Sequence, residues 1–466
     1  MSEAIAEMIL PSTYIEVRAE GLIGVGSIAT GNLGIVGTAA RGPVGEVVAL
    51  GGYSDALDAF ALYDPLSTPR LADNPLSLVR TLEQAFAGGA RSVYAVRIAN
   101  GTPVKAAVDV KTAGDAAGFT MTARDAGTWA NGIRYTLTQA AAADPWVLKL
   151  SVGNTKEEFS GLTTADLHAA LVTSTLVTVG ALSNGAAAPV SVAASTPLAG
   201  GSDGANVSAA DLAAGLALLA DQPVNIVIVA GFGADQAKGA IGAHLEATEN
   251  EGRERIAVLG AKSAVLADVE ADIGTLNDDR IVLVAPGLKA TDAADGKAVD
   301  LPPSYLAAVV AGKLATLAPH ISLTNKTLPI DGLVGPYNTT NYKKLLQERV
   351  LLVRQKFGFQ VVKGITTENA AFTQISVRRI VDYAKAGVRL GSDPYIGRLN
   401  NARVRAALKA TLDGFLSQMV VDEMLVSYEL DVSATRAQEI RGICAVTMTL
   451  MPTFSIDFIR VTMNLQ

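Results

Sequence analysis

Three short apolar runs, separated by helix-like stretches, constrain the fold of this chain more than any other feature. They are "VNIVIVAG" (224–231), "RIAVLGA" (255–261) and "RIVLVAPG" (280–287). Each run is apolar throughout rather than alternating, which is typical of a strand buried on both faces of a parallel sheet. A helix precedes the first run, with Ser208 as N-cap and Asp211 three residues later. This pattern predicts an α/β core with a doubly wound-like mixed sheet.

The N-terminal part repeats the alternation of strand and helix. Strands are expected at 34–38, 47–50 and 92–98, with a helix capped by Ser54 and another that carries Leu78, Leu82 and Phe86 on one face. Residues 101–200 differ, because short threonine- and valine-rich runs with one helix at 164–171 predict antiparallel strands. We therefore expect a β-rich domain inserted into an α/β core.

The C-terminal part contains two long helical segments, 373–391 and 400–424, and ends in a strand-like pattern. In the last residues, "FSIDFIRVTMNLQ", apolar Ile459, Val461 and Met463 alternate with polar Arg460 and Thr462. This is the period of a half-buried strand, yet no hairpin return follows it. A short strand pattern also lies near the other end, in "PSTYIEV" (11–17). Both ends thus predict strands that need a partner from elsewhere.

The composition indicates surface that is buried against partners. Hydrophobic residues make up 49% of the 466 residues and charged residues 18%, against about 25% in an average soluble domain. No apolar run reaches the ~18 residues of a membrane span, and no secretory signal is visible in "MSEAIAEMILPS". We expect oligomerisation and no membrane insertion.

Charge is distributed unevenly along the chain. From Tyr337 onward there are 17 basic and 11 acidic residues, whereas the preceding part has 21 basic and 34 acidic residues. A basic C-terminal third suggests a face that meets an acidic partner, although a solvated helix face explains the same charges.

No motif predicts catalysis. The Gly231-x-Gly233 turn between a strand and a helix resembles a dinucleotide-binding turn, but Gln236 occupies the third glycine position, so we interpret it as a tight turn. "GGSDG" (200–204) follows a loop, unlike a nucleophile elbow, and "GAKS" (260–263) lacks the upstream glycine of a P-loop. The single Cys444 excludes an intrachain disulfide and a cysteine-based metal site, and three distant histidines show no ligand spacing. We expect no cofactor, no metal and no direct nucleic-acid binding.

Several of these segments, in this order, resemble the contractile tail sheath proteins of phages and related injection systems. The resemblance is carried by "PSTYIEV", "GIVGTAARGPVGE" (34–46), "AFAGGARSVYAVRI" (85–98), "AGTWAN" (126–131), "GGSDG", "KGITT" (363–367), "ISVRRIVDY" (375–383) and "MPTFSIDFI" (451–459). The chain departs from the family at Ser12-Thr13, where Gly-Val is usual, and at Ile365, where an arginine is usual, so the role of that arginine is not carried over to this chain.

The resemblance implies a structural subunit that polymerises helically around an inner tube and contracts to drive the tube through a target envelope. In such proteins terminal arms add strands to neighbouring subunits. It implies as inter-subunit arm residues Tyr14, Ile15, Val17, Phe454, Ile456, Phe458, Ile459, Val461 and Met463. We expect a basic tube-facing surface built from exposed members of Arg378, Arg379, Lys385, Arg389, Arg398, Arg403, Arg405 and Lys409.

The implied organisation has six parts. They are an N-terminal arm (1–20), a first core part (21–100), an outward-pointing β-rich insertion (101–200), a second core part (201–338), a tube-facing domain (339–448) and a C-terminal arm (449–466). Expected partners are further copies of the chain, the tube, and baseplate and cap proteins. The expected location is a virion tail, or the bacterial cytoplasm and released particles of an injection system. Two alternatives from other classes are a Rossmann-like oxidoreductase using Gly231 and Gly233, and a β-rich surface-layer or adhesion protein, against which the α/β core argues.

Overall fold

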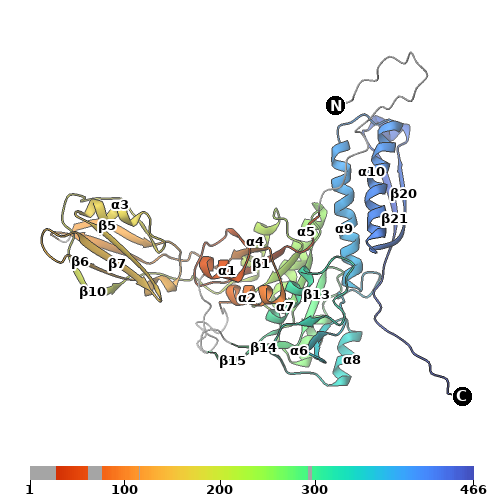
Figure 1. Ribbon diagram of the computed structural model, residues 1–466, viewed down its shortest axis with the longest axis horizontal. Helices are drawn as coiled ribbons and strands as arrows, with labels where there is room; N and C mark the ends of the chain where they lie inside the picture. Colours follow the sequence, from red (N-terminus) through yellow and green to blue (C-terminus); the bar gives the residue numbers. More distant parts are fainter. Residues whose placement is uncertain (1–27, 61–75, 115, 292–295, 466) are drawn as a thin grey trace, which may run out of the picture.

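The structure, a computed structural model, describes residues 28–60, 76–114, 116–291 and 296–465. The β-rich region lies at one end of the molecule, the large sheet in the middle, and the C-terminal helices at the other end (Figure 1). The strand predicted near Tyr14 lies outside the described residues.

A nine-stranded mixed sheet forms the centre of the molecule. Its parallel strands, in spatial order, are β3 (Val93–Arg97), β1 (Leu33–Gly37), β11 (Ile226–Val229), β12 (Ile256–Gly260), β13 (Ile281–Ala285) and β18 (Leu351–Gln355). Antiparallel strands complete both edges, namely β2 (Val47–Leu50) beside β3, and β19 (Phe359–Val361) followed by β16 (Thr327–Leu328) beside β18. The three apolar runs of the sequence are thus adjacent central strands, which confirms the mixed α/β class.

Helices cover both faces of this sheet. One face carries α1 (Tyr53–Phe60), α2 (Leu78–Gly88) and α7 (Pro303–Ala315), and the other carries α4 (Ala209–Leu219), α5 (Ala234–Asn250), α6 (Leu266–Ile273) and α8 (Thr339–Gln347). Along β11, Ile226 and Ile228 belong to the first core, whereas Val227 and Val229 belong to the second. This double burial explains why the strands are apolar without interruption.

Close helix packing and a cap support this core. Helices α2 and α7 approach so closely that a Cβ on Gly312 would lie 2.1 Å from the Ala85 carbonyl oxygen. Helix α4 begins with the expected capping box between Ser208 and Asp211.

A small antiparallel sheet of β15 (Ala298–Leu301), β14 (Gly287–Thr291) and β17 (Gly332–Val334) follows β13.

The β-rich region contains two antiparallel sheets around its own core. One sheet has the order β4 (Ala107–Thr112), β5 (Ala116–Ala123), β9 (Val177–Val179), and the other has β10 (Val192–Pro197), β6 (Arg134–Thr138), β7 (Trp146–Val152), β8 (Thr155–Gly161). Helix α3 (Thr164–Leu171) packs on them and coincides with the predicted helix. The run "LVTSTLVTVGAL" (171–182), which reads as one strand, instead contains the end of α3 and the short β9.

The C-terminal part pairs two long helices with a two-stranded sheet. Helices α9 (Ile375–Ser392) and α10 (Ala402–Val421) pack against β20 (Leu425–Ser433) and β21 (Ala445–Pro452), with α11 (Arg436–Ile440) between the strands (Figure 1). Strand β18 pairs with β13 in the large sheet, so a boundary at residue 339 divides the central sheet. The part of the chain that extends away from the sheet begins with α9, whose first turns still pack against the sheet.

Candidate assembly surface

The glycine motifs of the sequence support chain packing rather than an open site. A Cβ on Gly231 would lie 2.4 Å from the Ser77 Cβ, and one on Gly233 would lie 2.7 Å from the Lys262 Cα. The space that a dinucleotide phosphate would occupy against these glycines is filled by the chain itself. The turn between β11 and α5 therefore allows close packing.

The "GGSDG" and "AGTWAN" segments meet at the base of the β-rich region. Asp203 accepts a hydrogen bond from the Thr128 backbone N–H (3.0 Å), and the Asn131 side chain bonds both backbone groups of Gly201. The buried Arg97 of β3 donates to the Ala126 carbonyl oxygen at 3.0 Å. These segments thus join the β-rich region to the central sheet.

The C-terminal segment, residues 453–465, crosses away from the body of the protein without forming a strand (Figure 1). Its large apolar side chains are 60–98% exposed; they are Phe454, Ile456, Phe458, Ile459, Val461, Met463 and Leu465. Neither face of the period-2 pattern is buried within the described chain. Burying such side chains is favourable by about 25 cal/mol per Å² of apolar area, so the segment is suited to a partner surface.

The first residues of this segment are nevertheless held in place. The Asp457 carboxylate accepts hydrogen bonds from Thr324 (3.3 Å) and Gln374 (3.1 Å) and forms an ion pair with Lys363 (3.4 Å). The Gln374 side chain also accepts from the Ser455 backbone N–H at 3.1 Å. The root of the segment, residues 453–458, is therefore fixed, whereas no contact of this kind holds residues 459–465 in the described structure.

The two-stranded sheet offers a place for added strands. β20 and β21 pair only with each other among the described residues, so each has one edge of unpaired backbone groups. Such edges accept an extended chain through backbone hydrogen bonds, while alternate side chains set the register.

Two of the basic candidates, Arg378 and Arg379, are buried and therefore do not belong to the exposed members expected to face a partner. Arg378 binds Asp279 (2.7 Å) and Asp382 (2.8 Å), and Arg379 donates to the carbonyl oxygens of Thr30 and Leu317. Arg378 is 4% exposed and Arg379 is 6% exposed. Burial lowers the pKa of Arg379 to about 10, since the charged form loses hydration. The sequence pattern did not indicate that these two arginines are buried, because α9 is buried on both faces along its first two turns.

An ion-pair network joins α9 to the central sheet. Arg280, 3% exposed at its side chain, binds Glu249 (2.7 Å) of α5 and Asp382 (2.9 Å) of α9. Hydrogen bonds from Arg280 lower the pKa of Glu249 to about 2. Lys385 and Arg389 also pair with acidic residues at the end of α5 and just beyond it. Both are thus engaged within the chain, although each remains partly exposed.

The remaining basic candidates lie farther along the C-terminal part. Arg398 is exposed and lies over the Tyr395 ring at 5.3 Å, whereas Arg405 is largely covered and pairs with Glu439 at 2.9 Å. Arg403 and Lys409 are exposed on α10. The exposed charge is therefore concentrated toward the end of the C-terminal part that is remote from the sheet.

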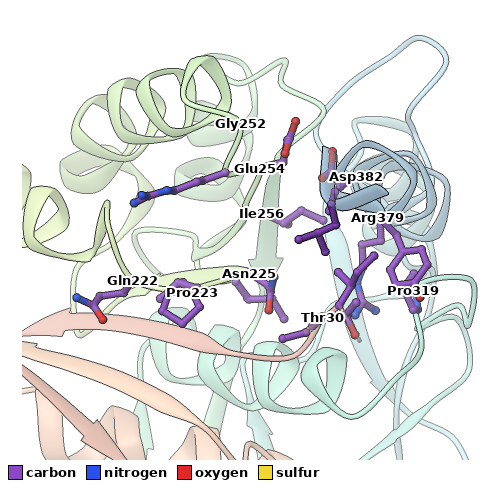
Figure 2. A pocket seen from close by; sticks show the side chains of 18 of the residues that line it. Thr30, Gln222, Pro223, Asn225, Gly252, Glu254, Ile256, Pro319, Arg379 and Asp382 are labelled. Carbon is purple, nitrogen blue, oxygen red and sulfur yellow. The ribbon is translucent and has the colours of Figure 1, made fainter. Parts of the chain in front are cut away.

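A pocket of about 410 Å³ lies where the described chain begins. It is lined by Thr30, by residues around Asn225 and Glu254 of the central sheet, and by Arg379 and Tyr383 of α9 (Figure 2). The described chain thus begins between the sheet and α9. The polar head of Arg379 is already bonded to backbone carbonyls, which leaves a structural role for it there.

Comparison with known proteins shows that this architecture is similar to that of tail sheath proteins. Residues 367–466 match the phage tail sheath C-terminal domain family. The chain superposes on the sheath tail protein of Desulfitobacterium hafniense with a TM-score of 0.67 and 19% identity, over 95% of this chain and 100% of the other. The chain has the contractile tail sheath fold. Residues 367–466 match the C-terminal domain family of tail sheaths, and the expected resemblance is confirmed.

Two further relatives agree with this assignment. The sheath fold also superposes on the anti-feeding prophage helical sheath in its contracted state, with a TM-score of 0.58 and 14% identity over 98% of this chain and 99% of the other. The tail sheath protein of Mycobacterium phage Bxz1 is 24% identical over 277 residues, 55% of this chain and 46% of the relative. The chain thus spans about half the length of that curated relative. No helix in the described ranges combines the length and apolar character of a membrane span.

Proposed function

We propose that this chain is a structural subunit of a contractile sheath, in a phage tail or an injection system, that polymerises helically around an inner tube. The observation that carries the proposal is the sheath fold together with a C-terminal segment whose large apolar side chains are exposed. Heterologous contacts that do not close generate helical assemblies, which is the geometry a sheath needs.

The terminal arms are the proposed links between subunits. Residues from Phe454 to Met463 add a strand to the free edge of β20 or β21 in a neighbour, and the N-terminal arm with Tyr14, Ile15 and Val17 adds another. Backbone hydrogen bonds supply affinity, and the period-2 side chains set the register. Such links persist while subunit bodies rotate, so a sheath shortens without falling apart.

The exposed basic residues of the C-terminal domain are the proposed contact to the tube. Arg398, Arg403 and Lys409 remain the principal members, since Arg378 and Arg379 are buried. Exposed charge pairs contribute only about 0–1 kcal/mol each, so several of them hold register yet release when the sheath contracts. The β-rich region, 101–200, lies at the opposite end of the molecule from the C-terminal domain and is proposed to point outward (Figure 1).

Baseplate and cap proteins are the proposed partners at the two ends of the sheath. We assign no catalytic role to the chain. The Rossmann-like alternative gains no support, because side chains and backbone of the chain itself pack against Gly231 and Gly233.

The test compares two double variants that add the same charge on opposite sides of the terminal strand. Val461→Asp with Met463→Asp places carboxylates on the apolar side, and Thr462→Asp with Asn464→Asp places them on the polar side. Electron microscopy of the purified full chain should show helical tubes or rings for the wild type and the second variant, and only dispersed subunits for the first. Equal assembly of both variants, or dispersed wild-type protein, would overturn the proposal.

A further inference from the structure

A hairpin at one side of the central sheet projects beyond the core. Strand β18 pairs with β13 only at Leu351 and Leu352, and the rest of β18 pairs with β19 alone among the described strands. The buried part of β18 ends at Val353, whereas residues 354–358 are all exposed. The base of this hairpin is therefore fixed in the sheet, and its tip extends away from it.

The tip of the hairpin holds a strained aromatic residue. Phe357 has a φ of +51° and Gly358 has a φ of +100°. Two adjacent tip residues with positive φ are ordinarily Asn-Gly, because a bulky side chain is crowded against its own backbone in this conformation. The Phe357 side chain is also 92% exposed, so burial within its own subunit does not offset the strain. Strain of this kind in an exposed aromatic residue indicates a role in contact with another surface.

The surroundings of Phe357 are basic. Residues 351–361 contain Arg354 and Lys356 and no acidic residue. Lys326 adds a third cation just before β16, which pairs with β19 beside the hairpin. A partner surface for this tip therefore accepts an aromatic ring and carries negative charge.

The outer face of α4 and α5 has this chemistry. The two helices pack on the same side of the sheet, and residues 208–221 and 234–251 contain six acidic residues and one lysine. Two of the acidic residues, Glu246 and Glu251, are exposed near the end of α5. Small or apolar side chains form the rest of the exposed surface, namely Ala209, Ala210, Ala213, Ala214, Ala217, Leu218, Ala243 and Ala247.

Two glycines of α5 have no packing reason within the subunit. A Cβ on Gly239 or on Gly242 would meet no atom within 4 Å. Glycine lowers the stability of a helix interior relative to alanine, so its presence here is unfavourable for the isolated subunit. Close approach of a partner to α5 accounts for both positions.

We propose that the hairpin tip with Phe357 packs on the outer face of α4 and α5 of a neighbouring copy, which rests on the proposed function. Helix α4 packs over β1 and β3, whereas the tip extends from β18, and β11, β12 and β13 lie between β1 and β18. At about 4.8 Å per strand, β1 and β18 lie about 19 Å apart. The two surfaces of one chain thus point to different neighbours. A contact of this kind is heterologous and repeats in one direction, as a helical polymer requires.

Disulfide crosslinking in the full chain tests the proposal, after Cys444→Ser has removed the native thiol. Gln355→Cys leaves Phe357 and the cations of the hairpin in place, and Ala217→Cys lies on the outer face of α4. The chain with both cysteines should form covalent ladders under mild oxidation, because a disulfide joins only Cα atoms about 4–7 Å apart.

The matched control combines Gln355→Cys with Ala87→Cys, an exposed alanine of α2 on the opposite side of the sheet. It should give no ladders, and neither should either cysteine of the first pair alone. Ladders of equal yield from the control, or none from the first pair, would overturn the assignment.

Phe357→Asn tests the aromatic anchor. Asparagine adopts positive φ more readily, so the Tm of the dispersed subunit should not fall. Loss of the ring should raise the protein concentration needed for assembly about tenfold. Val172→Asn, at a side chain 65% exposed in the β-rich region, should leave that concentration unchanged. Normal assembly of Phe357→Asn would contradict the anchor role.

Charge reversal tests the recognition. Arg354→Glu with Lys356→Glu should abolish the ladders, and Glu246→Lys with Glu251→Lys in the same chain should restore them. Ladders that persist after the first reversal would contradict this recognition. Electron microscopy of each sample separates the two proposals, since tubes without crosslinks retain the sheath function and reject only this contact, whereas dispersed wild-type subunits reject both.

Discussion

At the scale of single residues, Asp457 connects the C-terminal segment to the rest of the subunit. Its carboxylate meets Thr324, Lys363 and Gln374, three residues from separate parts of the chain, and its side chain is 10% exposed. The exit direction of residues 459–465 is therefore set by a polar contact rather than by packing, since those residues are exposed.

Asp457→Ala should remove the contacts that hold residues 453–458 and make these residues more sensitive to protease. Removal of hydrogen bonds to a charged group costs about 1–3 kcal/mol of local stability, which corresponds to chymotryptic cleavage after Phe454 that is roughly fivefold to 150-fold faster. Asp431→Ala, an exposed carboxylate on β20, serves as the control and should leave the rate unchanged. Equal cleavage of the two variants would show that Asp457 does not hold the segment.

At the scale of elements, α5 carries a buried histidine against the central sheet. The His244 ring lies 2.9 Å from the Arg255 guanidinium, and burial, together with that charge, lowers the pKa of His244 to about 4. The neutral ring is thus the form that the folded protein accommodates, whereas the unfolded chain protonates near pH 6.5.

This shift predicts a pH dependence with a definite sign. Between pH 6.5 and about 4 the unfolded state binds the proton and the folded state does not, so the free energy of unfolding decreases as the pH falls through this window. The loss is on the order of 3 kcal/mol for a shift of this size. Urea denaturation at several pH values should show this slope in the wild type and a flatter slope in His244→Gln.

His168→Gln is the matched control, because this histidine bonds the Gly180 carbonyl oxygen in the β-rich region, away from the central sheet. It should retain the wild-type slope for the central unfolding transition. A slope that persists in His244→Gln would assign the pH dependence to other groups, such as the carboxylates around Arg280.

At the scale of the whole molecule, the β-rich region and the central sheet have separate hydrophobic cores. Residues 100 and 205 lie side by side, with the Ala205 backbone N–H 3.0 Å from the Asn100 carbonyl oxygen. The chain thus leaves and re-enters the central sheet at one point. Across this junction, Arg41 pairs with Asp125 and lies over the Trp129 ring, and Arg97 donates to the Ala126 carbonyl oxygen.

Replacing residues 102–203 by a short glycine linker should therefore leave a folded central sheet and C-terminal domain. Circular dichroism and thermal unfolding should show one remaining cooperative core, with a modest loss of stability from the buried Arg97. Helical tubes of reduced diameter in electron microscopy would agree with an outward-pointing region. An unfolded product would show instead that the β-rich region is integral to the core.

The order of strands and helices was predictable because each depends on local pattern. Continuous apolar runs predicted the central strands, and Ser208 with Asp211 predicted the start of α4. The period-2 pattern after Phe458 predicted a strand that requires a pairing partner from outside the segment. In the structure these residues are exposed. Composition alone indicated that the chain buries surface in an assembly.

The placement of charged side chains was decided only by the tertiary structure. In the sequence, Arg378 and Arg398 are equivalent basic residues of one domain, but α9 lies against the central sheet at its first turns and leaves it at its last. Asp279 and Asp382 thus neutralise Arg378, whereas Arg398 stays in solvent. Asp382 lies only four residues from Arg378, but Asp279 lies 99 positions away, and no local pattern encodes that second contact. Local hydrophobic period and capping chemistry, in contrast, are encoded within a few residues.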